Sequence, residues 1–252
     1  MTASAALRAI LWDFDGTLVD TRARNLQVNR RIIQEVTGRG WEEFPVLRSQ
    51  TSYDEAQRVA VNWREFYRVT IGLDDDRIDW AGATWSSYQL ADPTPVALVD
   101  GVAEALGRLD GLPQGIVSQN ARETIESLLA LHGLGHRFEC VIGYAEVAMA
   151  CQKPAPDCLL LGLEKLTGRE PGRVLYIGDH PTDIRCAERA NRELAGRGSE
   201  LRVISVAAMW GIGTNDLEWA VGADHRAATP RDIVEIVERL DPARGQDLES
   251  RG

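Results

Sequence analysis

The chain has 252 residues, of which 44% are apolar, so it is long enough to bury a core in one large domain or in a domain with an insertion. Its 28 Lys and Arg residues against 38 Asp and Glu give a formal charge of −10, without a basic patch, so neither nucleic acid nor an acidic membrane surface is an expected partner. No run approaches the roughly 18 apolar residues of a membrane span, and the opening residues do not resemble a signal peptide. We therefore expect a cytoplasmic protein.

Five short apolar runs rich in β-branched residues are expected to form buried strands. They cover residues 8–14, 114–120, 140–144, 173–179 and 201–207. Segments with helical periodicity lie between them, and helix-start residues such as Asp100, Asn120 and Pro156 precede these segments. The alternation predicts a Rossmann-like α/β fold, in which helices cover a parallel sheet.

Residues 22–95 interrupt this alternation. They contain amphipathic stretches such as RARNLQVNRRIIQEV and no convincing buried strand, so we expect a helical insertion with its four tryptophans packed inside. The expected organisation is an α/β domain over residues 1–21 and 96–252, with an all-helical cap domain over residues 22–95.

Paired carboxylates follow two of the expected strands. Asp13 and Asp15 come after the first strand, and Asp179 and Asp183 come after the fourth. Because the carboxyl ends of parallel strands form the ligand edge of an open α/β sheet, these side chains are expected to gather there. Like charges disfavour each other's ionisation, and a hard cation such as Mg²⁺ would balance them. Taken alone, Asp15 with Gly16 could simply form a turn, and Asp183 could be an ordinary acid in the first turn of a helix.

Polar residues also follow the other two strands of this edge. Ser118 ends the second strand, with Asn120 two residues later, and Lys153 lies in the loop after the third. Lys153 and Lys165 are the only lysines in the sequence. A compact ammonium group near clustered carboxylates is suited to bind a phosphate, whereas Ser118 alone could simply end a strand or cap a helix.

Four segments in this order resemble the motifs of the haloacid dehalogenase-like hydrolase superfamily. They are DFDGTLVDT from Asp13, Ser118, KPAP from Lys153, and GDHPTD ending at Asp183. The chain is most similar to the subgroup of phosphoglycolate phosphatase and β-phosphoglucomutase, which carries a helical cap after the first strand. The segment WGIGTNDLEWAVGADHRAATPRDIVEIVERL resembles the closing strand and helix of that family.

The resemblance implies specific roles for the aspartates. Asp13 would be the nucleophile that forms an aspartyl phosphate, and Asp15 the general acid and base. Mg²⁺ would be bound by the Asp13 carboxylate, the main-chain carbonyl of Asp15 and Asp179, with Asp183 beside it. The phosphoryl oxygens of a small phosphorylated metabolite would be bound by Ser118, by Lys153 and by the backbone N–H groups after Asp15 and Ser118, which belong to Gly16, Thr17, Gln119 and Asn120.

The same resemblance separates competing activities. A dehalogenase of this kind lacks the second acid, which is present here as Asp15, and the phosphonatase branch needs a cap lysine that residues 22–95 do not contain. Phosphomonoester hydrolysis is the leading hypothesis, with a sugar-phosphate mutase as the alternative and a non-catalytic binding protein as a minor one. Arg48 of the cap is a candidate substrate contact or an ordinary exposed charge. The role of His180, the physiological substrate and the choice between monomer and homodimer stay open.

Overall fold

The computed structural model describes residues 6–60, 62–168, 170–211, 220 and 222–242. The chain divides into two compact units, which we call the sheet unit (Met1–Val19 with Leu98–Gly252) and the helical unit (Asp20–Ala97). The short strands β2 (Val19–Asp20) and β3 (Ala97–Leu98) pair with each other where the chain passes from one unit to the other. The domain limits expected from the sequence stay a proposal.

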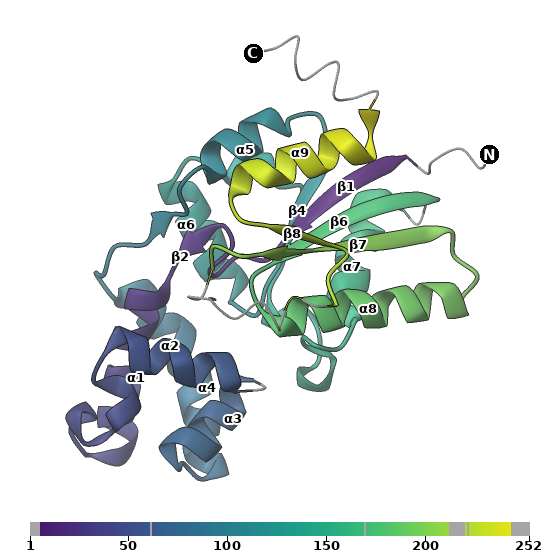
Figure 1. Cartoon of the computed structure of the whole chain (residues 1–252). Coiled ribbons are helices and arrows are strands. Elements are labelled where there is room, and N and C mark those ends of the chain that lie inside the picture. Colours follow the sequence, from purple (N-terminus) through teal and green to yellow (C-terminus); the bar gives the residue numbers. More distant parts are fainter. Residues whose placement is uncertain (1–5, 61, 169, 212–219, 221, 243–252) are drawn as a thin grey trace. The chain divides into compact units, whose positions relative to one another are not determined.

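A six-stranded parallel sheet forms the centre of the sheet unit, in the order β5-β4-β1-β6-β7-β8 (Figure 1). Its strands are β1 (Leu7–Trp12), β4 (Gln114–Val117), β5 (Cys140–Ile142), β6 (Gly172–Gly178), β7 (Leu201–Ala208) and β8 (His225–Ala227). This sheet confirms the predicted α/β fold class. Strand β8 belongs to the closing segment that resembles the family, of which residues 212–219 and 221 lie outside the described residues.

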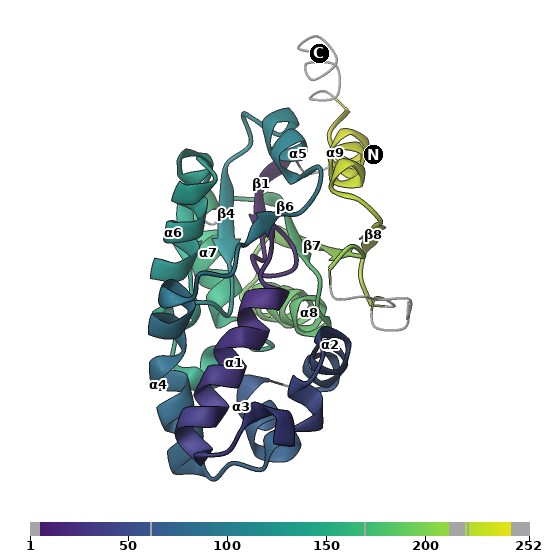
Figure 2. The same ribbon diagram turned by 90° about the vertical axis from the view of Figure 1, so that its left-hand side faces the viewer.

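Helices cover both faces of this sheet, as Figures 1 and 2 show. They are α5 (Val102–Arg108), α6 (Arg122–Leu131), α7 (Asp157–Thr167), α8 (Pro181–Gly196) and α9 (Pro230–Leu240). Helices α7 and α8 pack on one face, and α5 packs with α9 on the other. Because both faces are covered, the central strands are apolar almost throughout, and Ile10 and Leu11, which alternate between the faces, are both fully buried.

Four of the five expected strands extend further along the chain than the observed ones. Strand β1 ends at Trp12 and β4 at Val117, whereas the apolar pattern suggested ends at residues 14 and 120. The chain leaves the sheet at these points, so Asp13, Asp15 and Ser118 lie in loops at the carboxyl ends of the strands. This is the edge at which open α/β sheets bind ligands.

The helical unit is built around four α-helices and confirms the predicted helical insertion. These are α1 (Arg22–Thr37), α2 (Gln50–Val59), α3 (Trp63–Glu65) and α4 (Asp75–Ala91), with short 3-10 helices at Trp41–Glu43 and Pro45–Leu47 and a π-helix at Phe66–Ile71. Its core includes Leu26, Ile32 and Phe66, and Trp41, Trp63 and Trp85 pack against it. The fourth tryptophan of this unit, Trp80, is more exposed than the other three, at 39%.

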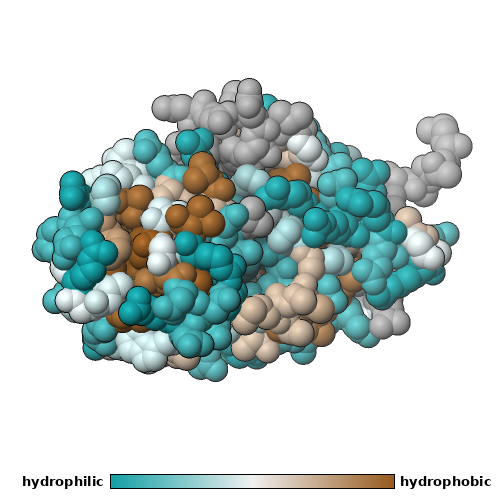
Figure 3. All heavy atoms as spheres, turned by 90° about the horizontal axis from the view of Figure 1, so that it is seen from below, coloured by the Kyte–Doolittle hydropathy of each residue, from teal (hydrophilic) through white to brown (hydrophobic). Residues whose placement is uncertain are grey.

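The surface drawn in Figure 3 is mostly hydrophilic, with apolar side chains in limited areas. The largest apolar exposures among the described residues are Val59 and Val69 of the helical unit and Leu131 and Met149 of the sheet unit. In the part of the chain that the structure describes, a search for a helix with the length and hydropathy of a membrane span finds none.

Candidate active site

Three neighbouring strands, β4, β1 and β6, deliver the first residues of the site to one edge of the sheet. Ser118 directly follows β4, Asp13 follows β1, and Asp179 follows β6. The main-chain N–H of Asp13 donates to the carbonyl of Ile177 at 2.7 Å, which continues the β1–β6 pairing by one residue. The position of Asp13 is therefore set by the sheet.

Lys153 joins the carboxylates that come from different strands. Its Nζ donates hydrogen bonds of 2.7 Å to Oδ1 of Asp13 and of 2.7 Å to Oδ1 of Asp183. The Lys153 side chain is only 2% exposed, and the side chains of Asp13 and Asp183 are 11% and 2% exposed. An ammonium group this deeply buried requires such partners, because an unpaired charge in the interior is strongly destabilising.

The carboxylates and the ammonium group shift each other's protonation. Burial raises the pKa of Asp13 to about 7, which the Lys153 ammonium opposes and the Asp183 carboxylate reinforces. Burial lowers the pKa of Lys153, but the carboxylates of Asp13 and Asp183 outweigh it, so that this pKa lies above its ordinary value. Lys153 therefore stays charged, and the site holds more negative charge than one lysine balances.

Asp179 is enclosed by small residues. The φ of Gly16 is +78°, and a Cβ placed there would lie 2.2 Å from Oδ2 of Asp179. A Cβ on Gly211 would lie at the same 2.2 Å distance from this oxygen. The Thr17 hydroxyl donates to Oδ1 of Asp179 at 3.3 Å, and Trp210 Nε1 donates to the Thr17 carbonyl at 3.0 Å. The loop after Asp15 thus requires glycine, for its backbone conformation and for the close approach of Asp179.

Asp13, Asp179 and Asp183 have the donors expected of a divalent metal site. Each is buried and offers a carboxylate oxygen, and the three oxygens lie within 4.8 Å of one another. Oxygen donors without His or Cys suit a hard cation such as Mg²⁺. Burial raises the pKa of Asp13, and the nearby Asp183 carboxylate raises it further, so a cation beside these groups would favour the ionised form. These residues therefore fit a bound divalent cation.

Asp183 is held by more hydrogen bonds than the sequence suggested. Besides Lys153, its Oδ1 accepts from the Tyr176 hydroxyl at 2.9 Å, and its Oδ2 accepts from the main-chain N–H of His180 at 3.1 Å. A Cβ on Gly178 would lie 2.4 Å from Cγ of Asp183, so the carboxylate packs directly on the end of β6. The sequence analysis did not identify Tyr176. A tyrosine in an otherwise aliphatic buried strand needs a partner for its hydroxyl group. This requirement could have marked Tyr176 as a residue that contacts the site.

Asp15 points its carboxylate at a residue that lies just beyond β4. The amide nitrogen Nδ2 of Asn120 lies 3.0 Å from Oδ2 and 3.2 Å from Oδ1 of Asp15. Nearby, the Ser118 hydroxyl accepts from the Asn120 main-chain N–H at 3.1 Å, and the Gln119 amide donates to the Lys153 carbonyl at 3.2 Å. Ser118 and Asn120 are buried, while Gln119 is exposed.

The main-chain donors expected to bind phosphate have partners within the chain. The N–H of Gly16 donates to the Val19 carbonyl at 2.8 Å, and that of Thr17 to the Phe14 carbonyl at 3.3 Å. Phosphate binding by Gly16, Thr17 and the residues after Ser118 remains a prediction. In the same loop region, the Gly16 main chain forms the turn that returns toward β2.

Two further candidates have defined surroundings. Arg48 lies in the helical unit, where it is exposed and its Nε donates to the Glu42 carbonyl at 2.7 Å. His180 is the N-cap of α8, and its Nδ1 accepts from the Thr182 main-chain N–H at 3.3 Å. Burial lowers the pKa of His180, which favours the neutral ring that this cap needs. His180 thus has a structural function as a helix cap.

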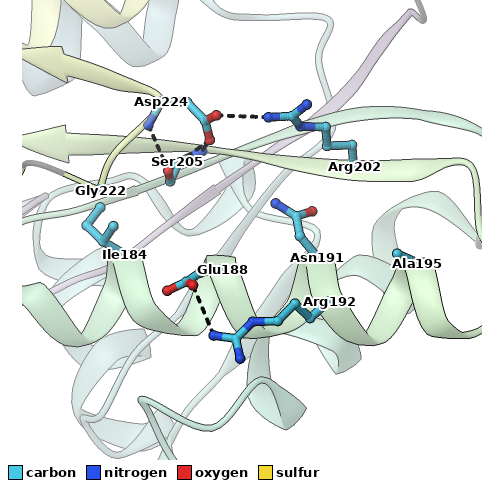
Figure 4. Close-up of a pocket in the computed structure, with 9 residues that line it drawn as sticks. All are labelled: Ile184, Glu188, Asn191, Arg192, Ala195, Arg202, Ser205, Gly222 and Asp224. Carbon is cyan, nitrogen blue, oxygen red and sulfur yellow. Dashed lines mark hydrogen bonds and ion pairs between the residues drawn. The ribbon is translucent and has the colours of Figure 1, made fainter.

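A separate cavity between α8 and β7 is lined by polar groups that already have partners (Figure 4). Asn191 exchanges two hydrogen bonds of 2.8 Å with the main chain of Val203. The Ser205 hydroxyl donates to Asp224 at 2.9 Å, and Arg202 donates to the same carboxylate at 3.0 Å. These contacts connect α8, β7 and the segment before β8, so their role is structural.

Comparisons with known proteins identify the family of this chain. The sequence pattern of haloacid dehalogenase-like hydrolases matches residues 10–196. A phosphoglycolate phosphatase of Synechococcus elongatus is 27% identical over 245 residues, covering 93% of this chain and 99% of that protein. The pyrophosphatase PpaX of Oceanobacillus iheyensis is 24% identical, covering 92% and 97%. The crystal structure of a subfamily IA hydrolase of this superfamily from Geobacter sulfurreducens superposes with a TM-score of 0.59 at 22% identity, covering 94% and 99%.

Proposed function

Because this chain belongs to the haloacid dehalogenase-like hydrolases, we propose that it is a Mg²⁺-dependent phosphatase that hydrolyses a small phosphorylated metabolite through an aspartyl phosphate on Asp13. The observation that carries the proposal is the group of three buried carboxylates, Asp13, Asp179 and Asp183, of which the first and the last bind the buried Lys153 ammonium. A structural ion pair needs one carboxylate for each ammonium, so this excess of carboxylates indicates a second cation.

The carboxylates of Asp13 and Asp179 and the main-chain carbonyl of Asp15 are the proposed Mg²⁺ ligands. Asp183 assists them, since both of its oxygens already accept hydrogen bonds from the protein. Bound Mg²⁺ neutralises the negative charge of the attacking carboxylate and of the phosphate, which would otherwise repel each other.

In the first step, an Asp13 oxygen forms a bond to phosphorus while the bond between phosphorus and the leaving oxygen breaks. Asp15 donates its proton to the departing alkoxide, so that the products are the free alcohol, the aspartyl phosphate and an Asp15 carboxylate. In the second step, Asp15 takes a proton from water as the water oxygen attacks phosphorus. The bond between Asp13 and phosphorus breaks, which releases phosphate and restores both aspartates.

Lys153 contributes a fixed positive charge beside the reacting carboxylate. Before the reaction its ammonium is shared by Asp13 and Asp183 at 2.7 Å each. When Asp13 becomes an acyl phosphate it loses its charge, so the ammonium can turn to the phosphoryl oxygens without leaving Asp183. Because Asp183 keeps the ammonium in the buried site, its positive charge is already in place when the phosphoryl group is transferred.

The names of two relatives, phosphoglycolate phosphatase and pyrophosphatase, support a small phosphorylated molecule as the substrate. A panel of phosphomonoesters that includes phosphoglycolate and hexose phosphates, with pyrophosphate added, is the suitable assay. We expect phosphate release that depends on Mg²⁺ and stops with a chelator. A mutase would instead interconvert sugar phosphates without net phosphate release.

The covalent mechanism is tested with variants of the two aspartates and p-nitrophenyl phosphate. Asp13→Asn should abolish turnover, whereas Asp15→Asn should give a burst of nitrophenol followed by slow phosphate release, because this acidic leaving group needs no proton but the second step needs the base. Rapid-mixing absorbance measures the burst. Turnover that persists in Asp13→Asn, or that needs no metal in wild type, would overturn the proposal.

A further inference from the structure

We propose that Asn120 is a positioning residue that holds the Asp15 carboxylate for proton transfer, and that its side chain does not bind the phosphoryl group. The inference rests on the proposed function, in which Asp15 is the acid and base. The family resemblance placed Asn120 among the phosphate-binding residues through its main-chain N–H, and the contacts of its side chain in this structure indicate a separate role.

The contact between the two side chains involves both carboxylate oxygens. Asn120 Nδ2 lies 3.0 Å from Oδ2 and 3.2 Å from Oδ1 of Asp15. The terminal torsion of an aspartate is soft, so neighbouring groups decide the direction of its oxygens. A donor that reaches both oxygens restricts this torsion far more than a donor to one.

The orientation of the Asn120 amide is fixed by its other end. The side-chain Oδ1 accepts a hydrogen bond of 2.8 Å from the main-chain N–H of Ala121. A main-chain N–H can only donate, so the atom facing it must be the amide oxygen, and the NH₂ group must face Asp15. Both polar ends of the Asn120 side chain therefore have partners within the protein, and its NH₂ group is directed at the Asp15 carboxylate.

The main chain of Asn120 is equally well anchored. The residue is 3% exposed, its N–H donates to the Ser118 hydroxyl at 3.1 Å, and its carbonyl accepts from the Tyr144 N–H at 3.0 Å. A Cβ on Gly143 would lie 2.7 Å from this carbonyl oxygen, so the neighbouring loop packs directly against it. Asn120 is thus a buried support for Asp15, which is only half-buried.

Two substitutions separate positioning from a purely structural role. Asn120→Ala removes both side-chain contacts. Asn120→Asp keeps an oxygen for the Ala121 N–H but presents an acceptor to Asp15 in place of a donor. Asn191→Ala is the matched control, because it removes an amide that is also bonded to the main chain, at Val203, but lies in the α8–β7 cavity (Figure 4).

The decisive measurement is kcat/KM for a series of aryl and alkyl phosphates with leaving groups of increasing pKa, at saturating Mg²⁺. A well-placed general acid contributes about 10²- to 10⁴-fold, and only for leaving groups that need a proton. We expect both Asn120 variants to lose about 10- to 100-fold with alkyl phosphates and less than about threefold with p-nitrophenyl phosphate. Asn191→Ala should leave the dependence on leaving group unchanged. An equal loss for every ester would overturn the inference, because loss of a phosphate contact or of folded protein acts on all substrates alike.

A double-mutant cycle gives an independent readout. If Asn120 acts only through Asp15, Asn120→Ala should change single-turnover phenol release from phenyl phosphate by less than about twofold in the Asp15→Asn background, although it slows this step in wild type. A loss of the same size in both backgrounds would overturn the inference while leaving the phosphatase proposal intact. A wild-type protein that hydrolyses none of the esters would contradict the proposed function itself.

Discussion

The Lys153 ammonium lies 2.7 Å from an oxygen of Asp13, a residue 140 positions earlier in the sequence, and their side chains are 2% and 11% exposed. This pair shares the site with the Asp183 carboxylate, which Lys153 also contacts. One buried ammonium therefore serves two buried carboxylates. The excess of carboxylates over ammonium groups should therefore show in the pH at which Asp13 takes up a proton.

Stability without metal should fall as the pH rises from about 4 to about 7. Burial raises the pKa of Asp13 from 3.8 to about 7, so over this interval the folded state holds a proton that the unfolded state has lost, and each rise in pH favours unfolding. The stabilising contribution of Asp13 to the free energy of unfolding is fully present below about pH 4 and is lost as the pH rises past about 7. Its size is on the order of a few kcal/mol.

Added Mg²⁺ competes with this proton, so the stabilisation by Mg²⁺ should grow from pH 5 to pH 7 and then level off. The measurement is the free energy of unfolding in denaturant at several pH values, with Mg²⁺ and in metal-free buffer. Asp13→Asn is the control. In this variant the free energies of unfolding with Mg²⁺ and in metal-free buffer should differ little at each pH. A Mg²⁺ effect of constant size over the whole interval would contradict the prediction.

Tyr176→Phe should weaken metal binding by about 10- to 100-fold, because the lost hydroxyl orients the Asp183 carboxylate. It should also cost about 1–3 kcal/mol of stability as a buried hydrogen bond to a charged group. Tyr67→Phe is the matched control, since the described residues provide no partner for the buried Tyr67 hydroxyl. That change should leave stability equal or higher. Mg²⁺ titrations of activity and denaturant curves measure both effects, and equal Mg²⁺ affinity in Tyr176→Phe and wild type would exclude the positioning role.

Gly16→Ala should combine backbone strain with a clash, since φ is +78° and the new Cβ would lie 2.2 Å from Asp179. Gly38→Ala is the control for strain alone, because its φ is +69° and a Cβ there would meet nothing within 4 Å. Both should lose roughly 1–2 kcal/mol of stability from the left-handed conformation. Only Gly16→Ala should also lose Mg²⁺ affinity and activity. If the two variants have the same kinetics, the enclosure of Asp179 has no part in the reaction.

Arg48→Ala tests whether the helical unit selects the substrate. We expect the ratio of kcat/KM values between preferred and poor metabolites to fall roughly tenfold, while p-nitrophenyl phosphate changes only severalfold. Arg77→Ala, at another exposed arginine of the helical unit, should leave this ratio unchanged. A parallel loss for all substrates would assign Arg48 a structural role, in line with its hydrogen bond to the Glu42 carbonyl.

The fold class was predictable because its evidence is local. Strands buried on both faces must be apolar over their length, so an apolar run such as the one around Ile10 predicts such a strand directly. Asp13 and Asp179 could be assigned to the same edge because parallel strands bring their carboxyl ends together. The strand ends were less predictable, since Phe14 continues the apolar pattern after the chain has left the sheet.

The contacts of individual side chains depended on residues distant in the sequence. Asn120 followed by Glu123 suggested a helix start, and α6 does begin nearby at Arg122. No local pattern, however, specifies that the other end of the Asn120 amide meets Asp15, which is 105 positions away. Tyr176 is similar, because a buried hydroxyl needs an acceptor but the sequence does not say which one.

The shortage of lysine in this chain has a practical consequence for chemical labelling. Acylating reagents attack neutral amines that they can reach, and the two lysines differ in both respects. Lys165 is exposed on α7, whereas Lys153 is buried and its pKa is raised by the carboxylates of Asp13 and Asp183. A fluorescent succinimidyl ester should therefore modify the side chain of Lys165 in the folded protein. The rate at which Lys153 is modified, measured by mass spectrometry of peptides, then reports how often the site opens.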